Sequence, residues 1–123
     1  MSPFVRQIDF ALEWNLIEAG NALFRQNHKA ENIFIVLNGR LRSILKSEGK
    51  KQLVGEYGRG DLVGIVEILM KADNSTTVVA IRDTEVAQIP SGLLDYIKYR
   101  HPRVATRLIQ MLSSKLLGKL KRK

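Results

Sequence analysis

The first 90 residues consist of short apolar runs separated by turn-forming residues, and this punctuation limits the fold more than any other feature. Residues 32–37, NIFIVL, are rich in β-branched and aromatic side chains, which is typical of a strand. Many short strands at near-regular spacing predict a mainly β protein, an antiparallel jelly roll or double-stranded β-helix. The other predicted strands are residues 14–17, 22–24, 40–46, 52–57, 76–80 and 84–89.

Two turns and two aromatic residues give this prediction more detail. Asn38 and Gly39 both tolerate positive φ, so the pair predicts a β-hairpin between its flanking strands. Residues 47–50 predict a second tight turn. We expect Trp14 and Phe34 to lie in the core, because large aromatic side chains dominate the burial of apolar surface.

After Pro90 the pattern changes to helical spacing. Ser91 is suited to cap a helix, and the spacing predicts helices over 92–101 and 102–119. The second helix is amphipathic, with an apolar stripe formed by Val104, Leu108, Met111, Leu112 and Leu116. The length of 123 residues predicts a single domain over 1–123, and the charged ending predicts excision from a larger chain.

The positive charge of the chain is unevenly distributed. The net charge is +8, and the sequence after Ile97 contains no acidic residue. This asymmetry indicates either an anionic partner or a solvated helix end, where cations are favourable. We expect no nucleic acid partner and a monomeric domain, with an anionic membrane surface or a protein partner contacted by Lys119, Lys121, Arg122 and Lys123.

Several kinds of site are excluded by composition. The chain has no cysteine, which excludes disulfides, cysteine-ligated zinc and a thiol nucleophile. His28 and His101 are far apart in sequence, and there is no G-x-S-x-G serine motif. We therefore predict no catalytic residue, no metal site and no cofactor in this domain. No apolar run approaches the ~20 residues of a membrane span.

The stretch from Gly58 to Ala80, GRGDLVGIVEILMKADNSTTVVA, contains a glycine turn, a short strand, a glycine, an apolar helical turn, a polar loop and a final strand. It resembles the phosphate-binding cassette of cyclic-nucleotide-binding domains, whose usual pattern is F-G-E-L-A-L, a loop, and P-R-A-A-T-V-x-A. The resemblance extends over nearly the whole chain, because further glycines occur where that family turns: Gly20, Gly39, Gly60 and Gly64.

The resemblance assigns roles to individual cassette positions. Gly64 takes the place of the glycine, Ile65 that of the ribose-binding glutamate, and Asn74 that of the phosphate-binding arginine. Losing two charged hydrogen-bond partners implies a loss of roughly 3–6 kcal/mol, or about 10²–10⁴ in affinity. The cassette is therefore predicted to be degenerate, with cyclic nucleotide binding weak or absent.

Other groups near these positions could replace part of the lost affinity. The hydroxyls of Ser75 and Thr76 remain hydrogen-bond donors, or serve only to cap the loop and the strand. Lys71 could contact an anion as a flexible point charge. Glu67 lies about 200° around a helix from Ile65, so it cannot replace the missing glutamate.

A narrower resemblance is to the neuropathy target esterase group of patatin-like phospholipases. The segments that carry it are SPFVRQIDFAL, VLNGRLRS, LVGEYGRGDLVGIVE, AIRDTEVAQIP and PRVATRLIQMLSSKLLG. The absence of the cassette arginine favours the esterase-related paralogue within that group. The resemblance implies a parent serine lysophospholipase that hydrolyses lysophospholipids such as lysophosphatidylcholine. It also implies a membrane anchor in the endoplasmic reticulum and repeats such as this one facing the cytosol.

The function predicted from the sequence is a non-catalytic regulatory or interaction module that contacts other domains of its parent. The alternative is a functional cyclic-nucleotide sensor that controls an attached effector. A transcription regulator would require a helix-turn-helix after Lys123. A small jelly-roll enzyme has no matching residue set.

Overall fold

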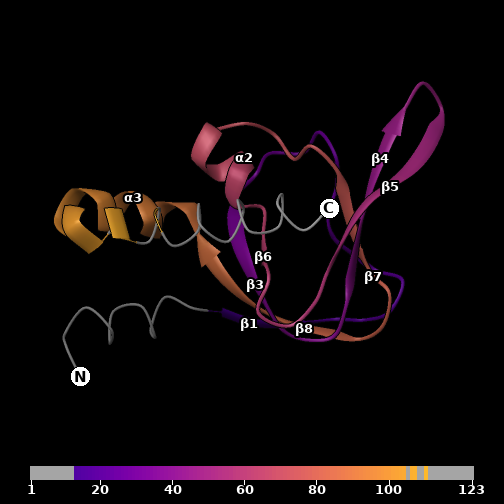
Figure 1. Cartoon of the computed structure of the whole chain (residues 1–123), viewed down its shortest axis with the longest axis horizontal. Coiled ribbons are helices and arrows are strands. Elements are labelled where there is room, and N and C mark those ends of the chain that lie inside the picture. The colour runs from indigo at the N-terminus through magenta and orange to yellow at the C-terminus, as the bar shows by residue number, and fades with distance from the viewer. Residues whose placement is uncertain (1–12, 105, 108–109, 111–123) are drawn as a thin grey trace. The chain divides into compact units, whose positions relative to one another are not determined.

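The computed structural model describes residues 13–104, 106–107 and 110 (Figure 1). The chain divides into two compact units, Met1–Ser91 and Gly92–Lys123, and each is described by itself. In chain order the elements are β1 Glu13–Ile17, β2 Ala22–Phe24, β3 Asn32–Asn38, β4 Leu41–Ser47, β5 Lys50–Tyr57, β6 Leu62–Val63, α2 Ile65–Met70, β7 Thr77–Ala80, β8 Thr84–Pro90 and α3 Ser91–Arg100.

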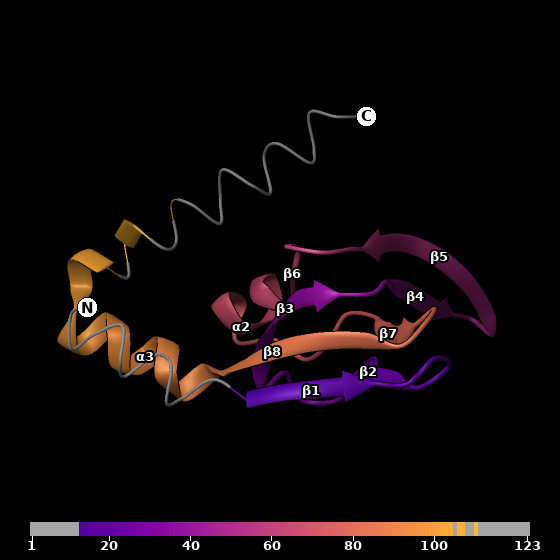
Figure 2. The same ribbon diagram turned by 90° about the horizontal axis from the view of Figure 1, so that it is seen from below.

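The strands of the first unit form two four-stranded antiparallel sheets (Figure 2). One sheet has the order β1-β8-β3-β6 and the other has the order β2-β7-β4-β5. Strands that are neighbours in sequence therefore alternate between the sheets, apart from the β4–β5 hairpin. This arrangement confirms the predicted mainly β, antiparallel roll with a short helix in the cassette.

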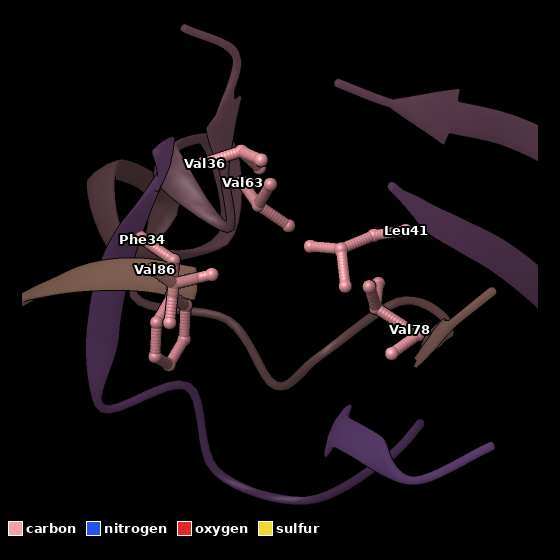
Figure 3. Close-up of a cluster of buried hydrophobic side chains, with 7 residues drawn as sticks. Phe34, Val36, Leu41, Val63, Val78 and Val86 are labelled. Carbon is pink, nitrogen blue, oxygen red and sulfur yellow. The ribbon is translucent and has the colours of Figure 1, made fainter. Parts of the chain in front are cut away.

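The core lies between the inner faces of the two sheets (Figure 3). It consists of Phe34, Val36, Leu41, Val63, Val78, Ala80 and Val86. Phe34 is 6% exposed, which confirms its predicted core position. Trp14 was expected in the core as well, and this prediction is wrong because its side chain is 67% exposed. It lies on the edge strand β1, whose packing against the core comes from Ile17 instead.

The predicted hairpin at Asn38-Gly39 is also wrong, because this turn joins two different sheets. β3 pairs with β6 and β8, whereas β4 pairs with β5 and β7. Gly39 has a φ of 113°, and a Cβ built there would lie 2.5 Å from the Thr84 hydroxyl oxygen. That hydroxyl accepts a hydrogen bond from the Arg40 backbone N–H at 3.0 Å. The glycine is needed to pass the chain closely over Thr84.

The second unit begins with helix α3, which the sequence placed at 92–101 and which spans Ser91–Arg100. Residues 102–104, 106, 107 and 110 are helical, as expected for the predicted helix 102–119. The rest of that helix lies outside the described residues, as do the stripe residues Leu108, Met111, Leu112 and Leu116. The extent of the domain, predicted as 1–123, stays a prediction. In the described part, no helix has the length and apolar character to cross a membrane.

Candidate functional site

The cassette has the order of elements that the sequence predicted. Strand β6 ends at Val63, Gly64 adopts a left-handed conformation with φ 85°, and α2 follows at once. A side chain at Gly64 would approach the backbone oxygen of Asn32 to 3.2 Å, so little room exists there. The helix ends at Lys71, which is also left-handed, and a loop then leads to β7.

Ile65 is buried at the start of α2, with 4% of its surface exposed. The helix contacts β3 of the first sheet. The position that the resemblance assigns to a ribose-binding carboxylate therefore holds an apolar side chain that stabilises the helix on the roll. Burial of an isoleucine side chain contributes roughly 1.5–3 kcal/mol to the stability of the fold.

Asn74 is buried in the loop after α2 and is 5% exposed. Its side-chain Nδ2 donates a hydrogen bond to the backbone oxygen of Arg25 at 3.1 Å. Its backbone N–H donates to His28 and its backbone oxygen accepts from Asn27, both at 2.8 Å. Asn74 therefore ties the cassette loop to the turn between β2 and β3. The amide that was expected to face a phosphate is used within the fold.

Ser75, next to Asn74, also has a partner within the cassette. Its hydroxyl donates to Oε1 of Glu67 at 2.7 Å. From the sequence, Glu67 cannot replace the missing ribose-binding glutamate, because it lies on a different side of the helix from Ile65. In the structure its carboxylate reaches the cassette loop instead. A serine hydroxyl has a single hydrogen to donate, and here a carboxylate accepts it.

Three hydroxyl groups are linked beside the second sheet, those of Ser43 on β4, Tyr57 on β5 and Thr76 just before β7. The Ser43 hydroxyl donates to the Thr76 hydroxyl at 2.7 Å, and Ser43 is only 2% exposed. Burial raises the pKa of Tyr57 above its ordinary value of 10.0, a hydrogen bond with Ser43 lowers it, and the negative charges of Glu67 and Asp61 raise it further. Tyr57 also packs against the core cluster. The phenol of Tyr57 is therefore neutral at physiological pH and fills space inside the roll.

Ser43 and Tyr57 are not among the residues that the sequence places beside the cassette. The spacing of Leu41 and Ser43 on β4 could have indicated their position, because residues two apart on a strand lie on the same face. The register pairs Leu41 with Tyr57 and Ser43 with Gly55. Side chains of directly opposed residues lie on the same face of an antiparallel pair. The register itself could not be read from the sequence, because β5 contains a bulge opposite Ser43 and Ile44.

A recess of about 550 Å³ lies beside the buried side chain of Asn74. Its lining includes Phe24 from β2 and the polar residues Arg25, His28, Lys29 and Glu31 from the following turn. The charges in this set partly cancel, since Glu31 opposes Arg25 and Lys29. The recess is therefore a mixed surface rather than a concentrated anion site.

The remaining predicted contact residues are placed as follows. Lys71 is exposed at the C-terminal end of α2. The basic residues Lys119, Lys121, Arg122 and Lys123 lie outside the described residues. Within the described ranges, no group of three or more His, Cys, Asp or Glu residues could hold a metal ion.

The family of the chain follows from its sequence together with this cassette. The model of the cyclic nucleotide-binding domain matches residues 15–98, which include both sheets, except the first two residues of β1, and the whole cassette. The chain belongs to the cyclic nucleotide-binding domain family. Its cassette keeps the backbone elements, and it has an isoleucine and an asparagine at the two positions where the family's pattern has ligand-binding charges.

Curated relatives of this cyclic nucleotide-binding domain support the narrower resemblance. Patatin-like phospholipase domain-containing protein 6 from Pongo abelii is 60% identical over 98% of this chain. Patatin-like phospholipase domain-containing protein 7 from Rattus norvegicus is 58% identical over the same share. The resemblance to the neuropathy target esterase group is confirmed, and the preference for the esterase-related paralogue stays a prediction. The chain spans 9% of the length of each of these two relatives.

Solved structures share the fold of the domain. The Thermus thermophilus catabolite activator protein has a TM-score of 0.77 at 23% identity, covering 97% of this chain and 57% of the other. The regulatory subunit of a cAMP-independent protein kinase A from Trypanosoma brucei has a TM-score of 0.72 at 25% identity. That match covers 94% of this chain and 45% of the subunit.

Proposed function

We propose that this domain is a non-catalytic regulatory or interaction module whose degenerate cassette binds cyclic nucleotides weakly or not at all. The observation that carries the proposal is the position of Asn74, whose amide is buried and bonded to the Arg25 carbonyl. In the family's pattern a guanidinium stands at this point, and its two parallel charged hydrogen bonds add both energy and geometric specificity to phosphate binding. Asn74 has no positive charge, and one of its amide hydrogens is already donated within the fold.

The hydroxyl groups around the cassette support the same conclusion. Ser75 donates to Glu67, and Ser43 donates to Thr76. A ligand would have to break these contacts before it could use the same groups, and each exchange would return little net free energy. The domain would then contribute to its parent through its surface and its folded shape. The same fold occurs in the Trypanosoma brucei subunit, which is described as the regulatory subunit of a cAMP-independent protein kinase A.

The parent chain is proposed to be a lysophospholipase. The relatives are named patatin-like phospholipases, and this domain would be one of several cytosolic repeats beside a serine hydrolase domain. Lysophospholipids such as lysophosphatidylcholine would be its substrates, and the endoplasmic reticulum membrane would hold its anchor. The domain's partners would be other domains of that parent.

A functional cyclic-nucleotide sensor is the second candidate. The observation that favours it is the orientation of Glu67, whose carboxylate reaches the cassette loop at Ser75 even though Ile65 is buried. In this candidate Glu67 would contact a ribose, while Lys71 and Ser75 would contact a phosphate. Lys71 lacks the fork geometry of arginine, so binding would be weaker than in a complete cassette.

Isothermal titration calorimetry with cyclic AMP and cyclic GMP separates the two candidates. We expect no saturable heat below millimolar ligand and no rise in melting temperature, since stabilisation scales as RT ln(1 + [L]/Kd). Saturable binding by the unaltered domain at ~10 μM ligand would overturn the proposal.

A repaired cassette gives the positive control. The double variant Ile65→Glu with Asn74→Arg restores both charges on the same backbone, and circular dichroism would first confirm that it folds. We expect it to bind with a lower Kd than the unaltered domain. A folded double variant without binding would show that the backbone of this cassette no longer has the shape for the ligand.

A further inference from the structure

The β4–β5 hairpin extends past the rest of its sheet (Figure 1). Strand β7 pairs with β4 only from Leu41 to Ile44, whereas the pairing of β4 with β5 continues to Ser47 and Lys50. The last part of the hairpin is therefore a two-stranded ribbon that ends at Glu48 and Gly49. Every residue from Lys46 to Val54 is exposed.

The register places two lysines and two apolar residues on one face of this ribbon. Leu41 and Ser43 face inward, since Leu41 lies in the core and Ser43 bonds to Thr76. Alternation along β4 then places Ile44 and Lys46 on the outer face. Leu53 pairs with Ile44 and Lys51 pairs with Lys46. The outer hairpin face consists of Ile44, Lys46, Lys51 and Leu53.

The Lys46–Lys51 pair is unfavourable within the isolated domain. Like charges directly opposite one another on paired strands destabilise a sheet. Both ion pairs found in the described part of the chain, Arg40–Glu56 and Arg42–Glu56, involve neither lysine. The two like charges therefore face each other with no ion pair among the described residues to compensate them. Such a departure from the usual pairing indicates that these lysines have a role outside the fold.

Protection of an exposed sheet edge explains only one of these lysines. Edge strands often carry lysine, which discourages pairing with another chain. This reason applies to Lys51 on the edge strand β5. It does not apply to Lys46, because the Gln26 side chain already bonds to the backbone N–H and oxygen of Lys46, at 2.9 and 3.0 Å.

Exposed apolar side chains accompany the two lysines. Leu53 is 54% exposed, and Val54, at the bulge, is 48% exposed. Helices that lie in the interface of a membrane combine lysine or arginine with large apolar side chains such as leucine, and this surface has the same combination. Farther along the same sheet, Arg40 and Arg42 outnumber the single carboxylate of Glu56 that they share, so the positive charge continues along this side of the sheet.

We propose that the outer hairpin face binds the surface of a membrane rich in anionic lipid. Lys46 and Lys51 would contact lipid phosphates, which removes the repulsion between the two lysines. Leu53 would enter the boundary between headgroups and acyl chains. A nucleic acid would also attract the lysines, but it offers no apolar medium for Leu53 and Val54. The apolar side chains therefore favour lipid.

Vesicle sedimentation tests this surface in the whole chain. The probes are vesicles of phosphatidylserine with phosphatidylcholine and vesicles of phosphatidylcholine alone, at low and high salt. We expect salt-sensitive binding to the anionic vesicles only. The double variant Lys46→Gln with Lys51→Gln should lower that binding at least about tenfold, since each lysine near an anionic surface contributes about a fivefold factor.

Further variants distinguish binding through the outer hairpin face from binding that depends only on the total positive charge. Lys29→Gln with Lys98→Gln removes the same charge from exposed positions elsewhere, and it should lower binding less than threefold. The hairpin variant should also melt at a slightly higher temperature, because a repulsive pair has been removed. Leu53→Ser should weaken the binding that remains at high salt, since the apolar contribution is not screened.

The proposal is overturned if the hairpin variant sediments like the unaltered chain. It is also overturned if the Lys29 and Lys98 variant loses as much binding, because total charge would then be the cause. A variant with glutamine at Lys119, Lys121, Arg122 and Lys123 provides one more comparison, and loss of binding in that variant alone would assign the contact to the C-terminal end. Loss of binding to a labelled DNA duplex, without loss on vesicles, would assign the face to nucleic acid.

Discussion

The side-chain amide of Asn74 donates to the backbone carbonyl of Arg25 at 3.1 Å, and this bond joins the cassette loop to the turn after β2. Two backbone hydrogen bonds of 2.8 Å lie beside it, to Asn27 and His28. The cassette loop is thus fastened to the roll by contacts within the protein. In a cassette that binds a nucleotide, charged contacts with the ligand would hold this loop.

Replacing Asn74 by aspartate should destabilise the domain. The change is nearly isosteric, but it places a carboxylate oxygen against the Arg25 carbonyl where an N–H donor lies now. The buried Asn74 side chain would lose its hydrogen bond and set a carboxylate against a carbonyl oxygen, which costs about 1–3 kcal/mol, and we expect the free energy of unfolding to fall by that amount. Urea unfolding measures it. Ser75→Ala is the control, because Ser75 is exposed and its loss should cost less than about 1 kcal/mol. Equal effects of the two changes would contradict the structural role of Asn74.

Gly39 and Gly49 both have positive φ but differ in their surroundings, so they form a matched pair. A Cβ at Gly39 would lie 2.6 Å from the Thr84 backbone, whereas a Cβ at Gly49 would meet no atom within 4 Å. Gly49→Ala should cost about 1–2 kcal/mol from backbone conformation alone. Gly39→Ala should cost at least about 2 kcal/mol more, because the backbone near Thr84 has to shift. Thermal or urea unfolding of both variants checks this, and similar losses would mean that Thr84 does not crowd the turn.

Much of the fold could be predicted because strand periodicity and turn residues are local properties. The seven predicted strands all correspond to observed strands, with small shifts at their ends, and the helix after Pro90 was expected from its spacing. The turn at 38–39 shows where local reasoning fails. Asn38-Gly39 is suited to a hairpin, but the sequence alone does not say whether β3 and β4 share a sheet. Long-range pairing with β8 and β7 decided that question.

The sequence predicts only those properties of the site that follow from the identity of each residue. The lack of charge at Ile65 and Asn74 was visible in the sequence. The bond from Asn74 to Arg25 joins residues 49 positions apart, and the Ser43–Thr76 bond joins residues 33 apart. Such contacts depend on strand register, and a single bulge in β5 changes which side chains face inward. The exposure of Trp14 has the same origin, since edge position is a property of the whole sheet.

The turn at the tip of the β4–β5 hairpin should be improved by asparagine. Glu48 has φ 53° and Gly49 has φ 78°, as expected for a two-residue turn of type I′. Glutamate is strained in this conformation, whereas asparagine tolerates it. Glu48→Asn should raise the free energy of unfolding by up to about 1 kcal/mol, as measured in urea. Glu48→Gln removes the same charge and keeps the strain, so it should have less effect. A larger gain from glutamine would indicate that charge, rather than backbone conformation, governs this turn.

The phenol of Tyr57 should make the domain lose stability at high pH. Burial raises its pKa in the folded protein above the ordinary value of 10.0, so the folded state keeps a proton that the unfolded state loses. The free energy of unfolding falls as pH rises wherever the folded state binds more protons. The contribution of Tyr57 is therefore fully present below pH 10 and is lost as pH rises from 10 through the higher folded value.

Urea unfolding of the unaltered domain and of Tyr57→Phe, from pH 8 to 11.5, isolates this effect. The other tyrosines and the lysines titrate in both proteins and cancel in the difference. We expect that difference to be constant up to about pH 9 and to shift above pH 10 in favour of the phenylalanine variant. A difference that stays flat across the whole range would show that the Tyr57 phenol titrates in the folded domain as it does in the unfolded chain.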